Sequence, residues 1–181
     1  MPPRADAERR ALAAEIRAKG RRLEGFAALF DRETRIGHFS ETIRSGAFRA
    51  TLASGRDVLA LVDHDPSRVL ARTRSNTLRL AEESRGLAFD LDVPDTQAGR
   101  DVLALAQRGD VGGASFAFTV PPGGDAWDGD RRELRAVELH EISVVLAWPA
   151  YEGTTVNARA AALARPVVRI LARRWLNTLA A

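Results

Sequence analysis

The chain has 181 residues, of which 45% are hydrophobic and 28% are charged, as is usual for a globular protein with one main domain. It contains no cysteine, which excludes disulfides, thiolate metal sites and cysteine nucleophiles. The formal net charge is only +3, and no apolar run approaches the roughly 20 residues that span a bilayer. We therefore expect neither a membrane span nor a specific nucleic-acid partner. No basic leader followed by an apolar run opens the chain, which predicts a cytoplasmic protein.

The two ends of the chain differ from its middle. Residues 1–22 are alanine-rich and polar with few large apolar side chains, which predicts a weakly packed N-terminal helical arm. Residues 158–181 carry five arginines and no acid, and apolar residues recur at helical spacing from Val167 to Trp175. We expect a basic C-terminal helical tail there. Such a helix packs on its own domain or on a dimer partner, or it contacts nucleic acid, an acidic scaffold or a membrane surface.

Between these ends, short apolar or alternating segments bounded by turn formers predict strands. These segments are 23–30, 58–62, 69–73, 77–80, 87–93, 111–120 and 134–146. One helix interrupts them, with Asp95 or Thr96 as N-cap and Gly109 as C-terminal stop. Residues 121–130 (PPGGDAWDGD) are too rich in turn formers to predict regular structure. Many strands with short connections predict a compact, mainly antiparallel β-barrel or sandwich with helices at its edge.

Histidine is scarce in this sequence, which makes the setting of each one informative. The three are His38, His64 and His140. His64 follows the apolar run VLALV within the segment LVDHDPS, where a predicted buried strand emerges into a loop. A histidine there is well placed to meet a substrate. The alternative is a surface histidine in a turn, flanked by Asp63 and Asp65.

Ser115 lies in the segment VGGASFAFTV. Strand alternation places Gly113, Ser115 and Ala117 on one face and Phe116 and Phe118 on the other, which we predict to be the core side. The serine would then have small neighbours, leaving room for an acyl group or a peptide at its hydroxyl. The alternative is a sheet serine beside glycines that permit tight packing or a bulge.

Glu141 lies in the apolar strand segment ELHEISVV, where a carboxylate needs a partner and a histidine ring is a suitable one. The alternative is that Glu138 and Glu141 pair with arginines on a solvated face. With Ser115 and His64, Glu141 fits a proton relay. An imidazole, whose unperturbed pKa is close to neutrality, removes the serine proton during attack, and the carboxylate fixes the tautomer of that imidazole. We therefore name His64, Ser115 and Glu141 as candidate catalytic residues.

A rival enzyme hypothesis treats Asp63, His64, Asp65 and His140 as metal ligands, because nitrogen and oxygen donors suit zinc or manganese. Adjacent residues of one strand point to opposite faces, so Asp63 and His64 would rarely share an ion. We therefore expect no metal and no cofactor.

Several segments carry a family resemblance through their order and spacing. They are EGFAALFD, SGAF, LVDHDPSRVLART, GLAFDLDVPDT, GGASFAF and ELHEISVVLAWPAYEGTTV, which together cover about residues 23–156. In this series the chain resembles the caudovirus prohead serine proteases. The resemblance implies a fold similar to the herpesvirus assemblins, a β-barrel with surrounding helices. It also implies Ser115 as nucleophile and His64 as base. The family's strand motif carries over to Glu141, whereas the second histidine of the herpesvirus relatives would point to His140; we expect Glu141.

The resemblance also implies what such an enzyme does. It would be a serine endopeptidase within the assembling prohead, acting on scaffold or on the N-terminal segment of the major capsid protein, and on itself. We expect a protease domain at residues 23–157, with the arms 1–22 and 158–181 removed on activation, and a homodimer or higher oligomer. The host particle stays open between phage, prophage and gene transfer agent. The alternative is a non-catalytic scaffolding or binding protein of the capsid interior, suggested by the basic C-terminal segment.

Overall fold

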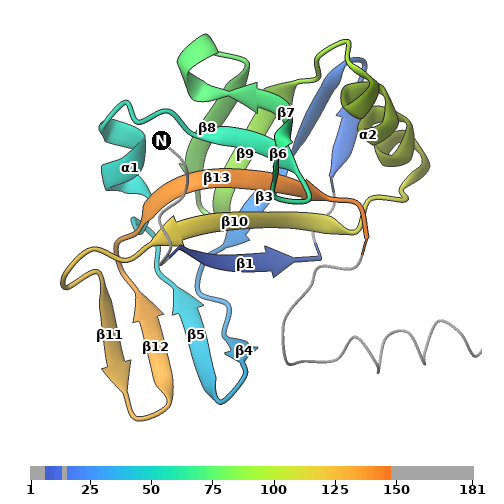
Figure 1. Ribbon diagram of the computed structural model, residues 1–181. Helices are drawn as coiled ribbons and strands as arrows, with labels where there is room; N and C mark the ends of the chain where they lie inside the picture. The colour runs from blue at the N-terminus through green and yellow to red at the C-terminus, as the bar shows by residue number, and fades with distance from the viewer. Residues whose placement is uncertain (1–6, 14–15, 148–181) are drawn as a thin grey trace, which may run out of the picture.

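The computed structural model describes residues 7–13 and 16–147; the predicted C-terminal tail at 158–181 lies outside them. The sheet that holds the candidate residues has five strands in the order β1-β10-β13-β6-β7 (Figure 1). Their bounds are Glu8–Leu12 (β1), Gly113–Thr119 (β10), Glu138–Val145 (β13), Leu59–Val62 (β6) and Asp65–Arg72 (β7). Strand β10 is antiparallel to both of its neighbours, whereas β13 and β6 are parallel.

Two four-stranded sheets complete the β structure. One has the order β11-β12-β5-β4, and the other has the order β2-β3-β9-β8. The bounds in the first are Asp125–Asp128 (β11), Arg131–Leu134 (β12), Phe39–Ile43 (β5) and Thr34–Ile36 (β4). Those in the second are Arg17–Lys19 (β2), Arg22–Leu29 (β3), Gly86–Asp92 (β9) and Leu78–Glu83 (β8).

The helices are few and peripheral. They are α1 (Arg49–Ala53), α2 (Gln97–Arg108) and one 3₁₀ turn (Thr73–Ser75). Helix α2 forms as predicted: the Thr96 hydroxyl accepts a hydrogen bond from Gly99 N at 3.2 Å, and Gly109 ends the helix at φ 74°. Within the described ranges, no helix is long and apolar enough to cross a membrane.

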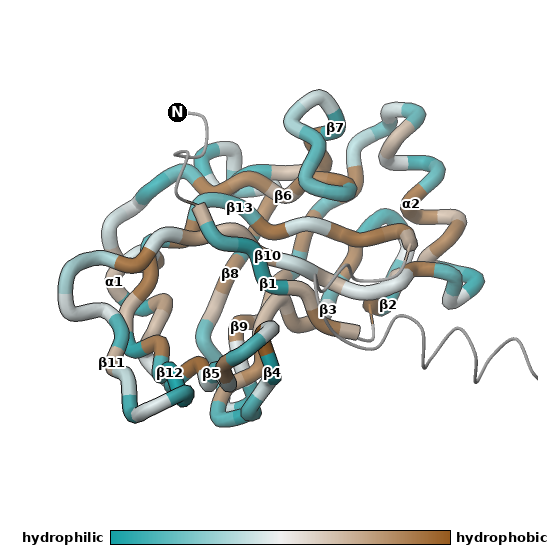
Figure 2. The backbone as a smooth tube through the Cα atoms, turned by 60° about the horizontal axis from the view of Figure 1, so that its bottom comes forward, coloured by the Kyte–Doolittle hydropathy of each residue, from teal (hydrophilic) through white to brown (hydrophobic). Residues whose placement is uncertain are grey.

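Phenylalanines form the centre of the core. Phe48, Phe116 and Phe118 are fully buried, and the ring centroids of Phe116 and Phe118 lie 5.2 Å apart in a stacked arrangement. Figure 2 shows hydrophobic residues along β13 and β6, with a hydrophilic hairpin loop beside β7. The predicted core side of β10 is therefore correct, but its other face is covered as well, because every residue from Gly113 to Thr119 is buried.

The prediction of a mainly β protein with peripheral helices is confirmed, whereas the closed barrel is not found. The described strands form three sheets, and β1 and β7 are the two edges of the largest one. The physical reason is that the chain repeatedly changes sheet. It leaves β3 for β4, passes from β5 through α1 to β6, and passes from β10 to β11. Strands that follow each other in sequence therefore often pair with other partners.

The predicted N-terminal helix is wrong for the described residues. Residues 8–12 form β1, whose register with β10 pairs Ala11 with Ser115, and residues 17–19 form β2, which pairs with β3. The helix propensity of alanine is worth only tenths of a kcal/mol per residue over most side chains. Backbone pairing with distant strands outweighs it.

The predicted loop at 121–130 is also corrected. Its second half forms β11, which pairs with β12 from Asp125↔Leu134 to Asp128↔Arg131. The turn between the strands contains Gly129 at φ 59°, a left-handed conformation that glycine adopts without steric cost. The turn formers of this segment therefore make a hairpin loop.

Candidate active site

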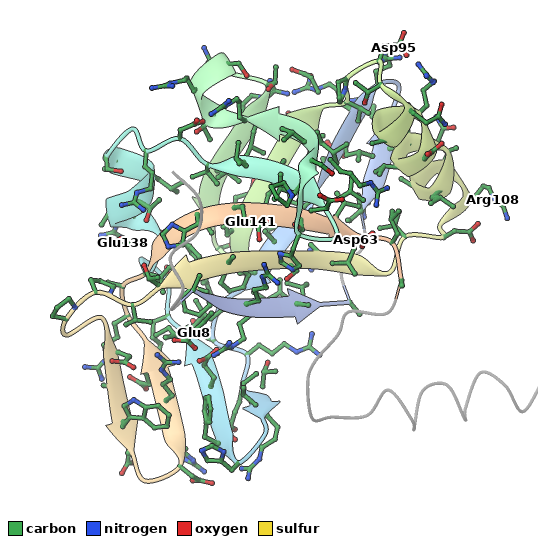
Figure 3. All side chains as sticks on the ribbon, in the orientation of Figure 1. Glu8, Asp63, Asp95, Arg108, Glu138 and Glu141 are labelled. Atoms are coloured by element: carbon green, nitrogen blue, oxygen red, sulfur yellow. The ribbon has the colours of Figure 1, made fainter. Side chains whose placement is uncertain are left out.

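Three adjacent strands of the five-stranded sheet bring the candidate residues together. In the register of β10 and β13, Ser115 pairs with Ser143 and Ala117 pairs with Glu141. Strand β6 lies on the other side of β13, with Val62 beside Val144, and His64 is the second residue after β6. Figure 3 labels Glu141 on β13 next to β10. Residues 51 and 77 positions apart in sequence therefore meet on one face of the sheet.

The imidazole of His64 bridges the other two side chains. Its Nε2 lies 2.7 Å from Ser115 Oγ, and its Nδ1 is in contact with Glu141 Oε1. Ser115 is 1% exposed and Glu141 is 5% exposed, so solvent screens this chain of contacts little. The structure thus brings all three predicted residues into one hydrogen-bonded series.

The conformation of a tight turn fixes the imidazole. Asp63 and His64 are the two-residue loop of the β6–β7 hairpin, with φ values of 51° and 59°, as in a type I′ turn. Left-handed backbone costs a non-glycine residue on the order of 1–2 kcal/mol. Hydrogen bonds from Asp63 N to Val144 O at 3.0 Å and from Leu146 N to Asp63 Oδ1 at 2.9 Å hold this loop on β13. The imidazole of His64 is therefore placed by a turn whose backbone is hydrogen-bonded to the neighbouring strand.

Ser143 is a site residue that the sequence reasoning missed. Its hydroxyl donates a hydrogen bond to Glu141 Oε2 at 2.7 Å and accepts one from His64 N at 3.1 Å. It thus connects the carboxylate to the backbone of the turn. The signal was present in the segment ELHEISVV, because strand alternation places Glu141 and Ser143 on the same face.

His140 occupies a different position. The register of β10 with β13 passes from Ala117↔Glu141 to Phe118↔Leu139, which leaves His140 as the extra residue of a β-bulge. Its Nδ1 lies 3.3 Å from Arg56 Nη1, and its Nε2 lies 3.1 Å from Thr119 Oγ1. The ring next to Ser115 is that of His64, and the carboxylate next to His64 is that of Glu141.

The four residues of the metal hypothesis are not gathered at one point. Asp63 accepts hydrogen bonds from Leu146 N and, at 3.4 Å, from Arg68; Asp65 accepts from Ser67. Among the described residues, no group of three or more possible ligands is arranged to hold a metal ion. A separate hollow of about 600 Å³ lies over β3, β8 and β9, and its lining includes neither Ser115 nor His64.

The arrangement has the parts that acyl transfer needs: a hydroxyl, a base within hydrogen-bond reach and a carboxylate behind that base.

Residues 7–166 match the model of the family described as caudovirus prohead serine protease. Among solved structures, the chain is similar to the capsid assembly protease gp21 of bacteriophage T4, with 10% identity and a TM-score of 0.56, over 78% of this chain and 96% of that one. That likeness shows the fold alone. No curated protein matches. Because the matched residues make up most of the sequence, as its motifs predicted, this chain belongs to the caudovirus prohead serine protease family.

Proposed function

We propose that the protein is a serine endopeptidase in which Ser115 is the nucleophile, His64 the general base and Glu141 the residue that orients the imidazole. The continuous series Ser115 Oγ, His64 Nε2, His64 Nδ1, Glu141 Oε1 is the observation that supports these roles. Its buried carboxylate favours the tautomer with hydrogen on Nδ1. That tautomer leaves Nε2 free to accept a proton.

The reaction follows from these positions. Ser115 Oγ attacks the carbonyl carbon of a peptide bond while its proton passes to His64 Nε2, and the carbonyl oxygen becomes an oxyanion. The imidazolium, stabilised by Glu141, then donates that proton to the leaving amine as the C–N bond breaks. Water attacks the resulting ester, gives one proton to Nε2 and releases the acid as the proton returns to Ser115.

Family membership supports capsid proteins as the substrate class. We propose that the enzyme acts within the assembling prohead and cleaves scaffold or the N-terminal segment of the major capsid protein. We also propose that it processes its own chain at the arms 1–22 and 158–181. Mass spectrometry of the protein recovered from finished capsids tests this self-processing, and full-length chain there would contradict it.

A serine-reactive phosphonate tests the catalytic assignment directly. The purified protein is labelled, and the modified residue is identified by peptide mapping. We expect the label on Ser115, and we expect Ser115→Ala to abolish both labelling and cleavage of capsid precursor while the unfolding transition is unchanged. Ser67→Ala is the matched control, because Ser67 is exposed on β7 and contacts Asp65. Cleavage that survives Ser115→Ala would exclude Ser115 as nucleophile.

A further inference from the structure

Strand β1 lies along the edge of β10 at which Ser115 is placed (Figure 1). The pairing is antiparallel and runs from Glu8↔Phe118 to Leu12↔Ala114, with Ala11 opposite Ser115. Because β1 is the last strand of its sheet on this side, it occupies the place where an extended peptide would add to β10. A peptide substrate of Ser115 would have to reach this same edge.

The backbone of β1 contacts the reactive hydroxyl itself. Ser115 Oγ donates a hydrogen bond to the carbonyl oxygen of Arg10 at 2.8 Å, while His64 Nε2 lies 2.7 Å from the same Oγ. A serine hydroxyl has one hydrogen, so it cannot be donated to both neighbours. While Arg10 O accepts it, His64 cannot take it. The contact is to the carbonyl oxygen, and attack requires the carbonyl carbon, so β1 is bound beside the nucleophile without being positioned for cleavage.

The side chain of Arg10 is held in a buried acidic site. Arg10 Nε and Nη2 donate to the two carboxylate oxygens of Glu41 at 2.6 Å and 2.9 Å, and the Glu41 side chain is only 3% exposed. The guanidinium also lies 5.4 Å from the ring centroid of Phe118. This bidentate geometry with an aromatic neighbour suits a guanidinium better than an ammonium.

Charged contacts, more than apolar burial, attach β1 to the domain. Glu8 accepts hydrogen bonds from Arg132 at 2.7 Å and 2.9 Å, next to the Arg10–Glu41 pair. Of the five residues of β1, Ala11 alone is buried, and its first three residues are hydrophilic (Figure 2). Releasing β1 would therefore expose little apolar surface, and its free-energy cost would come mainly from the ion pairs of Glu8 and Arg10.

We propose that β1 is a tethered pseudo-substrate, and that the edge of β10 which it covers is the binding site for an extended peptide with a basic side chain received by Glu41. While β1 is docked, it covers the edge of β10 against substrate, and its Arg10 carbonyl competes with His64 Nε2 for the Ser115 hydrogen. Undocking opens the site. This inference rests on the proposed catalytic role of Ser115 and adds the substrate-binding edge and its intramolecular occupant.

A reversible cross-link in the full-length chain tests the proposal. Leu12 and Ala114 are paired across β1 and β10, and the native sequence has no cysteine, so Leu12→Cys/Ala114→Cys forms one defined disulfide. We expect the oxidised protein to react with a serine-directed phosphonate at least tenfold more slowly than the same protein after reduction. Leu12→Cys alone controls for the thiol.

Arg10→Ala supplies an independent arm in the opposite direction. Loss of the Glu41 contacts should undock β1, so phosphonate labelling of Ser115 should be several-fold faster than in the native chain. Arg9→Ala is the matched control, because Arg9 is an exposed arginine of the same strand. A peptide of residues 7–13 (AERRALA) added to Arg10→Ala should inhibit labelling, and the same peptide with glutamate at the Arg10 position should inhibit at least tenfold less.

The outcomes separate this inference from the catalytic assignment. Equal labelling of the oxidised and reduced double variant would show that β1 does not close the site and would overturn the inference, with Ser115 still the nucleophile. So would slower labelling of Arg10→Ala with an unchanged unfolding transition, because β1 would then be a permanent part of the site. No labelling of Ser115 in the native chain, the reduced variant and Arg10→Ala would overturn the proposed function.

Discussion

Replacing Ser143 by alanine tests whether the hydrogen bonds of its hydroxyl hold Glu141 and the backbone of His64 in place. The change removes the hydrogen bond to Glu141 Oε2 at 2.7 Å and the acceptor of His64 N–H at 3.1 Å. A hydrogen bond to a charged group is worth about 1.5–3 kcal/mol, because the ion is otherwise left short of partners in a buried site. Each 1.4 kcal/mol of transition-state stabilisation corresponds to about a tenfold change in rate. We therefore expect kcat/KM to fall about 10- to 100-fold.

The measurement is cleavage of a capsid-precursor peptide by Ser143→Ala, together with urea unfolding. Thr119→Val is the matched control. Thr119 is also a buried hydroxyl residue, and it lies on β10, but its hydroxyl contacts His140 at the β-bulge and not Glu141. We expect the control to keep its kcat/KM. A rate for Ser143→Ala within twofold of the native rate, with intact folding, would refute the argument that Ser143 holds Glu141 and the turn in place.

Three further predictions concern the charge network and one close backbone contact. Arg132→Met removes the guanidinium that contacts Glu8 and Glu41, so we expect the free energy of unfolding in urea to fall by about 3 kcal/mol, and an unchanged value would contradict the network's role. Burial acts to raise the pKa of Glu8, but hydrogen bonds from Arg132 and Arg10 outweigh it and lower that pKa below its ordinary 4.5. The Glu8 contribution to stability is therefore present above pH 4.5 and lost as pH falls through the lowered value, and Glu8→Gln should flatten this loss in thermal melts across that range. Gly112→Ala would place a Cβ 1.6 Å from the carbonyl oxygen of Ala147, so we expect the free energy of unfolding in the same urea assay to fall by about 3 kcal/mol; native stability would show that the segment before β10 and the segment after β13 can move apart.

The sequence was sufficient where local chemistry decides the structure. Helix α2 begins after Thr96 and ends at Gly109 because capping and left-handed glycine act within a few residues. The alternation in β10 likewise separated Ser115 from Phe116 and Phe118. Each of the three candidate side chains alone left a structural alternative open, and they could be named together because the order and spacing of the family motifs fixed them.

Non-local pairing and unusual hairpins account for what the sequence did not predict. Nothing near residues 8–12 indicates a strand, because the partner of β1 lies more than one hundred positions later in the chain. The strand β11 was missed for a different reason: its partner β12 follows after a turn of only two residues, but the turn formers of residues 121–130 concealed the hairpin. The left-handed backbone at Asp63 and His64 is imposed by the two-residue loop of the β6–β7 hairpin. Such a conformation is difficult to predict from sequence where the loop contains no glycine.

The proposed nucleophile, base and orienting acid come from β10, from the turn after β6 and from β13, which has a consequence for when the chain could first cleave other proteins. No single strand brings the proposed centre together, because β6 and β13 must lie side by side before the imidazole meets its carboxylate. With the proposed roles, proteolytic competence would arise only when β10, β13 and β6 have assembled. A chain in which these strands have not yet paired would therefore lack the proposed proteolytic centre.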